Sequence, residues 1–271
     1  MSLLEIDGLC IGLPAGDGLH ELVRDVHLRA EAGEVVGLAG ESGSGKTLTA
    51  LSVLGMLPDG AETRGQVRFL EQDVLSLPQR ELRRMRGADV AMVFQDPTTA
   101  LHPMLDIGTQ LTEHLRVHRG VSRKAARARA VELLELVRMP DPQGVLSAYP
   151  HRFSGGMKQR IAIAAALACE PQLLIADEPT TALDVTVQAG ILRLLDRLRA
   201  ETGMAVLLIT HDLGVMNVTT DRLYVMQSGE IVEHGPTRQV LSAPRHAYTR
   251  SLLDALADEP GGTPAPAGAR G

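Results

Sequence analysis

The chain has 271 residues, of which 44% are hydrophobic and 22% charged, a balance that suits one or two folded domains. The net charge of −6 gives no general attraction to nucleic acid, so we expect no nucleic-acid partner. Cys10 and Cys169 form no C-x-x-C pair, which favours a reducing compartment. The longest apolar run, 161–169, is far shorter than the roughly 20 residues that span a bilayer. The first residues lack a basic stretch followed by an apolar one, so we expect no secretory leader. Any membrane role is therefore expected to come through a partner.

The first part of the chain is predicted to combine strands with one helix. Loose alternation of apolar and polar residues indicates antiparallel strands at the start. A short apolar strand then leads into a glycine-rich loop and a helix over 47–57, which Pro58 ends. Strands are predicted over 3–13, 26–28, 35–39, 66–70 and 90–94.

The middle of the chain, about 96–170, changes to a helical pattern. Helices are predicted over 107–119 and 123–137, with basic residues on one face. His114 and His118 lie four residues apart on the first of these helices. Because no third ligand and no H-E-x-x-H motif accompanies them, a solvated helix face is favoured over a metal site.

The last part of the chain returns to alternating strands and helices. Strands over 173–176 and 205–210 flank a helix over 187–200, an arrangement typical of a parallel sheet. A hairpin is predicted across Ser228-Gly229, and a helix ends the folded part near residue 257.

The glycine-rich loop fits the pattern G-x-x-x-x-G-K-[ST] and lies between a predicted strand and a predicted helix. Successive backbone N–H groups and a helix N-terminus can surround an anion there, and the glycines let the loop curl around phosphate oxygens. In such a loop Lys46 places its positive charge beside the β and γ phosphates, and the Thr47 hydroxyl is a ligand of Mg²⁺. The predicted phosphate-binding residues are Gly40, Glu41, Ser42, Gly43, Ser44, Gly45, Lys46 and Thr47.

A second motif is an apolar strand that ends in Asp177 and Glu178. Asp177 is expected to hold Mg²⁺, and Glu178 to polarise the water that attacks the γ-phosphate. Two acids alone would equally suit a helix cap, but beside a phosphate loop they indicate an Mg–nucleotide site. The two motifs leave kinases, helicases and transporter motors open. A GTPase is disfavoured, because the only asparagine, Asn217, precedes Val218 and not the lysine of Asn-Lys-x-Asp.

Residues 153–160, Phe-Ser-Gly-Gly-Met-Lys-Gln-Arg, resemble the signature sequence of ABC ATPases, whose usual form is Leu-Ser-Gly-Gly-Gln. The intact core, Ser154-Gly155-Gly156, precedes a predicted helix and so offers a second anion site. Other matches follow in the order of the family. Gln95 resembles the Q-loop glutamine, Asp184 closes a D-loop-like segment, and His211 resembles the H-loop histidine.

The resemblance covers about residues 3–257 and implies an α/β fold of the P-loop NTPase class. The family combines a mainly parallel core sheet with an N-terminal antiparallel β-subdomain and a helical insert. We therefore expect one ABC ATPase domain over 1–257, with a helical subdomain at about 96–170 inside it. The Gly/Pro/Ala-rich stretch 258–271 is expected to be a disordered tail.

The same resemblance implies an ATPase that uses ATP and Mg²⁺. The catalytic residues it implies are Glu178, His211 and Gln95. The Mg²⁺ ligands are Thr47, Gln95 and Asp177. Beside the phosphate loop, the nucleotide contacts are Ser154, Gly155, Gly156, Asp184 and, as the residue that stacks on adenine, His20.

Several sequence segments, among them residues 176–188 and 243–253, resemble the corresponding segments of dipeptide, oligopeptide and nickel importers. Such systems imply a second, usually different ATPase subunit, two membrane permeases and, indirectly, an extracytoplasmic binding protein. The subunit would lie peripherally on the cytoplasmic face of the inner membrane. Many peptide importers of this kind carry a Cys-rich segment after this point, and residues 254–271 contain no cysteine. In this respect the chain resembles nickel or metallophore importers, so transport of nickel or a metallophore is the alternative to peptide transport. A soluble ABC ATPase without a permease is the alternative outside this class.

Overall fold

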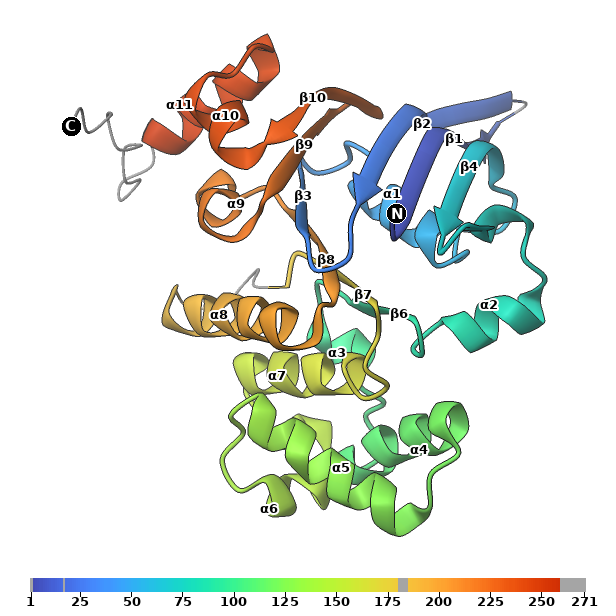
Figure 1. Ribbon diagram of the computed structural model, residues 1–271, viewed down its shortest axis with the longest axis vertical. Helices are drawn as coiled ribbons and strands as arrows, with labels where there is room; N and C mark the ends of the chain where they lie inside the picture. The colour runs from blue at the N-terminus through green and yellow to red at the C-terminus, as the bar shows by residue number, and fades with distance from the viewer. Residues whose placement is uncertain (1, 17, 180–184, 259–271) are drawn as a thin grey trace.

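The structure, a computed structural model, describes residues 2–16, 18–179 and 185–258. Two sheets and two groups of helices make up the fold (Figure 1). The strands are β1 (Leu4–Ala15), β2 (Gly18–Ala30), β3 (Val35–Ala39), β4 (Glu62–Phe69), β5 (Gln72–Asp73), β6 (Val90–Val93), β7 (Leu173–Asp177), β8 (Ala205–Thr210), β9 (Arg222–Gln227) and β10 (Glu230–Pro236). The helices of the core are α1 (Lys46–Val53), α2 (Gln79–Met85), α8 (Val185–Thr202), α9 (Leu213–Thr219), α10 (Thr237–Ser242) and α11 (Ala247–Asp258).

The central sheet has the order β10-β9-β3-β8-β7-β6, and only β10 runs antiparallel to its neighbour. Strands β3, β6, β7 and β8 are short apolar runs because both faces of this part of the sheet are covered. Alternate residues face opposite sides, so Val35 and Ala39 join one hydrophobic cluster while Val36 and Leu38 join the other. The parallel register places Ala39 beside Thr210 and Asp177 beside Ile209. The carboxyl ends of β3, β7 and β8 therefore meet at one edge.

The antiparallel sheet, in the order β2-β1-β4-β5, covers one face of the central sheet together with α1. Leu4, Ile6, Leu9 and Ile11 of β1 are fully buried in the shared core. β2 begins at Gly18, well before the strand predicted over 26–28, because it pairs with β1 along almost its whole length.

The other face of the central sheet packs against helices that interrupt the chain between β6 and β7. These are α3 (Pro97–Ala100), α4 (Ile107–Arg119), α5 (Arg123–Leu136), α6 (Pro142–Leu146) and α7 (Gly155–Ala166). Of these, α7 contacts β6 as well as α3, α4 and α5, so it joins the helical part to the sheet. Figure 1 shows α4, α5 and α6 at the end of the molecule away from the antiparallel sheet.

This architecture confirms the predicted fold class, a mainly parallel core with an antiparallel β-subdomain and a helical insert. Some elements differ from prediction. Helix α1 ends at Val53 and not near residue 57, because the N–H groups of Gly55 and Met56 turn back to the carbonyls of Ser52 and Leu51. The short helices α2, α3, α6, α9 and α10 were not predicted. No helix in the described part of the chain is long and apolar enough to cross a membrane.

Gly65 in β4 generates a test of the antiparallel sheet. Its φ is +85°, and an added Cβ would lie 2.2 Å from the Gly8 carbonyl oxygen, which is backbone and has little freedom to move. We expect Gly65→Ala to lower the free energy of unfolding by about 2–5 kcal/mol, from about 1–2 for the left-handed backbone and about 1–3 for overpacking. Gly120→Ala is the matched control, with φ +63° and no atom within 4 Å of the new Cβ. Equal losses for the two variants in urea unfolding would contradict the contact.

Candidate functional site

A cavity of about 490 Å³ opens at the edge where the carboxyl ends of β3, β7 and β8 meet. Parallel sheets commonly bind ligands at this edge. Its lining comes from the glycine-rich loop, from the ends of β6, β7 and β8, and from one residue of β2. The lining residues are Leu22, Ser42, Gly43, Gly45, Lys46, Thr47, Leu48, Gln95, Asp177, Glu178 and His211. Residues predicted from four separate segments of the sequence therefore meet here.

Lys46 is the buried cation of the site, with 5% of its surface exposed. Its ammonium donates hydrogen bonds to the carbonyl oxygens of Gly40 and Glu41, both at 2.7 Å, and to the Ser44 hydroxyl at 3.3 Å. Burial lowers the pKa of Lys46, while nearby carboxylates, Glu178 foremost, act in the opposite direction. Among the described residues no carboxylate forms an ion pair with it. The ammonium is thus held by its own loop at a place where an anion would be bound favourably.

Thr47 and Asp177 form the next pair, with the Thr47 hydroxyl donating to Asp177 Oδ2 at 2.9 Å. Thr47 follows Lys46 in the first turn of α1, and Asp177 is the last residue of β7. Asp177 is 6% exposed, and burial raises its pKa, although the Thr47 hydrogen bond acts to lower it. A hydroxyl and a carboxylate side by side are oxygen ligands of the type that Mg²⁺ prefers.

Glu178 connects two distant segments. One carboxylate oxygen accepts a hydrogen bond from Gln95 Nε2 at 2.7 Å, and the other lies 3.2 Å from His211 Nδ1. Its backbone has φ +44°, and its N–H donates to the Ile209 carbonyl at 2.8 Å. A non-glycine residue in this conformation is uncommon, and such residues gather at functional sites. Glu178 therefore lines the cavity with its carboxylate held by Gln95 and His211.

The other predicted site residues lie elsewhere. Ser154 caps α7, its hydroxyl accepting from the Met157 N–H at 3.4 Å, and neither it nor Gly155 or Gly156 lines the cavity. Asp184 lies outside the described residues. His20 is exposed on β2 and is not among the lining residues, whereas Leu22, two residues further along that strand, is.

Leu22, Leu48 and Tyr248 were not predicted to be at the site. Leu22 and Leu48 line the cavity, and the Tyr248 hydroxyl accepts a hydrogen bond from the Glu41 N–H at 3.0 Å. Leu22 lies at an irregularity in the pairing of β1 with β2, so simple strand alternation does not predict its position. Tyr248 belongs to α11, about two hundred residues from the loop, and no local pattern indicates the contact.

The two histidines of α4 do not both lie on a solvated face. His114 is half-buried against Gly87, and its ring centroid is 4.8 Å from that of His118. Burial, together with the neighbouring His118, lowers the pKa of His114. Among the described residues, no group of three or more His, Cys, Asp or Glu side chains is arranged to hold a metal ion.

Comparisons with known proteins agree with this fold. The family model described as ABC transporter matches residues 23–181. A probable D,D-dipeptide transport ATP-binding protein, DdpD of Escherichia coli, is 48% identical over 253 residues, covering 93% of this chain and 77% of the relative. The oligopeptide transport ATP-binding protein OppD of Salmonella typhimurium is 45% identical over 254 residues, covering 94% and 76%. The dipeptide transport ATP-binding protein DppD of Bacillus subtilis is 46% identical over 256 residues, covering 94% and 76%.

Solved structures give the same result. A dimeric ATP-binding cassette in a post-hydrolysis state, bound to ADP and Pi, superposes with a TM-score of 0.78 at 29% identity, covering 87% of this chain and 99% of that one. The cbiO1 protein of Clostridium perfringens, part of the ABC transporter complex cbiONQ, shares the fold with a TM-score of 0.75 at 24% identity, covering 89% and 91%. The chain belongs to the ABC transporter family and is a P-loop ATPase with that family's cassette fold.

Proposed function

We propose that the chain is the ATP-binding and ATP-hydrolysing subunit of an importer of the dipeptide and oligopeptide type, which drives uptake through partner permeases. The observation that carries the proposal is the meeting of Lys46, the Thr47–Asp177 pair and the Gln95–Glu178–His211 group in one cavity. The relatives described above are all named for peptide transport. The nickel or metallophore alternative gains no support from them.

The cavity fits an Mg²⁺–ATP complex. The loop 40–47 supplies backbone N–H groups and the Lys46 ammonium for the phosphates, and Thr47, Asp177 and Gln95 supply oxygen atoms for Mg²⁺. Mg²⁺, when bound, neutralises charge on the phosphates. Burial disfavours the charged forms of Lys46 and Asp177. The phosphates would stabilise the charge of Lys46, and Mg²⁺ would stabilise that of Asp177.

Glu178 is the proposed general base. Its carboxylate would orient the attacking water and accept its proton, while Gln95 and His211 hold the two oxygens in place. The His211 side chain is 61% exposed and the Glu178 side chain 15%. His211 is therefore free to contact a γ-phosphate, whereas Glu178 is protected from bulk water.

Ser154, Gly155 and Gly156 support a composite site. They form the exposed start of the twelve-residue helix α7 and contribute nothing to this chain's own cavity. We infer that they, with Asp184, contact ATP held by a second ABC ATPase subunit, which is a different chain. Adenine would stack on His20, beside Leu22. Because half of each site then comes from the other subunit, the isolated chain is a weak ATPase.

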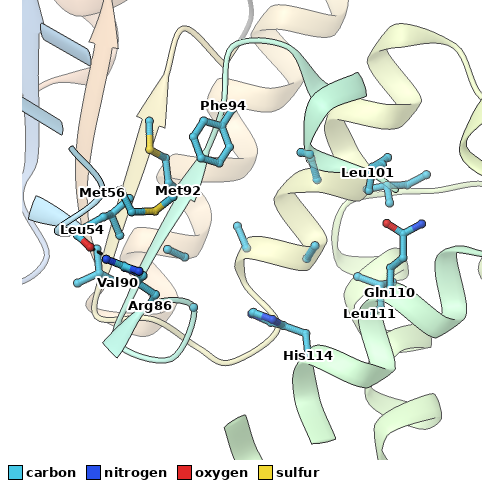
Figure 2. A pocket seen from close by; sticks show the side chains of 17 residues that line it. Leu54, Met56, Arg86, Val90, Met92, Phe94, Leu101, Gln110, Leu111 and His114 are labelled. Atoms are coloured by element: carbon cyan, nitrogen blue, oxygen red, sulfur yellow. Dashed lines mark hydrogen bonds between the residues drawn. The ribbon is translucent and has the colours of Figure 1, made fainter. Parts of the chain in front are cut away.

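A separate groove is proposed as the docking site for the permease. It measures about 370 Å³ and lies between β6 and helices α3, α4 and α7. Figure 2 shows Met92 and Phe94 on the β6 side and Gln110, Leu111 and His114 on α4, with Arg86 at one end. An apolar lining with a few polar groups suits an inserted segment of a partner protein. Since Gln95 follows Phe94 directly, an occupant of this groove would sit beside the residue that holds Glu178.

Docking of the two ATPase subunits to the two permeases of the transporter would place this subunit peripherally on the cytoplasmic face of the inner membrane. An extracytoplasmic binding protein would deliver the cargo from the other side. A soluble ABC ATPase without a permease is the alternative, and co-purification with membrane permeases distinguishes the two.

Transport assays test the proposed function. In cells that express the subunit with the permeases it co-purifies with, wild type should take up dipeptides and short oligopeptides but not nickel–metallophore complexes. Lys46→Ala should abolish uptake and weaken ATP binding by about 10- to 150-fold, since hydrogen bonds to a charged group contribute about 1.5–3 kcal/mol. Lys124→Ala, an exposed site on α5, is the control. Nickel uptake without peptide uptake would overturn the cargo assignment.

Glu178→Gln tests the general base. In the assembled transporter this variant should bind ATP as wild type does, while its hydrolysis rate falls about 10²- to 10⁴-fold, because the amide cannot accept the proton. The exposed Glu62→Gln should hydrolyse ATP normally. Full ATPase activity of the Glu178 variant rules out the assignment.

Asp177→Asn tests the cost of the buried carboxylate. Burial raises the pKa of Asp177 in the folded state, so its ionised form destabilises the fold at neutral pH, and this cost disappears as pH falls through the folded-state pKa towards the ordinary value of 3.8. Without nucleotide, Asp177→Asn should therefore melt at a higher temperature than wild type at neutral pH, with the difference shrinking on acidification. It should also lose Mg²⁺-dependent ATP binding. Exposed Asp59→Asn should change neither property, and a lower melting temperature for Asp177→Asn at neutral pH would contradict the argument.

A further inference from the structure

The segment at the start of α11, Ala-Pro-Arg-His-Ala-Tyr-Thr-Arg over 243–250, lies outside the cavity lining and meets the phosphate loop through Tyr248. It is fixed to the central sheet through Glu233 of β10. The two carboxylate oxygens of Glu233 accept the backbone N–H groups of Arg245 at 2.8 Å and His246 at 3.0 Å. His246 Nδ1 in turn accepts the Tyr248 N–H at 3.2 Å. The first turn of α11 is therefore held in a defined position.

From this position Tyr248 reaches the phosphate loop. Its side chain is 8% exposed, and its hydroxyl accepts the Glu41 N–H at 3.0 Å. Burial raises the pKa of Tyr248, so the acceptor is a neutral hydroxyl at physiological pH. The hydrogen bond joins the second residue of the loop to a helix near the end of the described chain.

The bonded N–H belongs to the Gly40–Glu41 peptide unit, and the carbonyl of that same unit accepts from the Lys46 ammonium at 2.7 Å. One rigid peptide plane thus links the Tyr248 hydroxyl to the cation that is proposed to bind phosphate. Rotation of this plane would break both hydrogen bonds together. The backbone at Gly40 is also closely packed, since a Cβ there would lie 2.2 Å from the Met226 carbonyl oxygen.

We propose that Tyr248 is a positioning residue for the phosphate loop. Its hydroxyl fixes the Gly40–Glu41 peptide in the orientation that holds Lys46 and gives the loop the shape that receives nucleotide. Preorganised loops bind more tightly because less order has to be imposed on binding. The inference rests on the proposed function, since it concerns the affinity of the same loop for ATP. The alternative is a purely structural role, in which Tyr248 only packs α11 against the core.

Tyr248→Phe separates these roles because it keeps the ring and removes the hydroxyl. Loss of one hydrogen bond of about 1 kcal/mol should raise the dissociation constant for ATP about 5-fold in the purified full chain. Hydrogen exchange at the Glu41 amide should become faster. The melting temperature should change no more than in the control.

Tyr224→Phe is that control. Tyr224 is equally buried, at 4% exposure, and its hydroxyl accepts a backbone N–H of the same kind, from Arg29 at 3.1 Å, away from the loop. It should keep the wild-type affinity for ATP and the wild-type exchange rate at Glu41. Equal ATP affinity of Tyr248→Phe and wild type, or weaker binding with unchanged exchange at Glu41, overturns the proposal. If wild type itself binds no ATP, the proposed function fails instead, so the two failures are distinguishable.

Discussion

The parallel pairing of β7, β8 and β3 is the constraint on which the site depends. Side chains from residues 46, 177 and 211 approach one another because the strands that carry them end at the same edge in a fixed register. Both faces of this sheet are buried, one against the antiparallel sheet and the other against helices. A shift of one residue would exchange the two faces, so the hydrophobic core itself maintains the alignment. The precision of the site is thus supplied by apolar residues that never touch the ligand.

The charged groups at this edge oppose folding as much as they serve binding. Lys46 and Asp177 are both buried, and burial disfavours the charged form of each. Glu178 adds a backbone conformation that non-glycine residues rarely adopt. Backbone strain and buried charge are concentrated where a bound ligand of opposite charge can relieve them, so nucleotide binding would stabilise the whole domain.

Local motifs in the sequence were enough to predict the fold class and most of the lining of the cavity. The loop 40–47 and the pair Asp177-Glu178 are contiguous, so each can be recognised from neighbouring residues. That Gln95 and His211 hold the same carboxylate, 83 and 33 residues away, could not be predicted, because it depends on strand order. The missed helices α6 and α9 are short and begin at capping aspartates, Asp141 and Asp212, which were the available signal.

The contact between Tyr248 and the loop also has a spectroscopic consequence. The chain contains no tryptophan and three tyrosines, so its intrinsic ultraviolet emission comes from tyrosine alone. Within the described residues only Tyr248 is hydrogen-bonded to the phosphate loop, whereas Tyr149 is exposed and Tyr224 is bonded to Arg29. The protein therefore carries a native fluorophore in contact with the phosphate loop, and only two other tyrosines contribute to the emission.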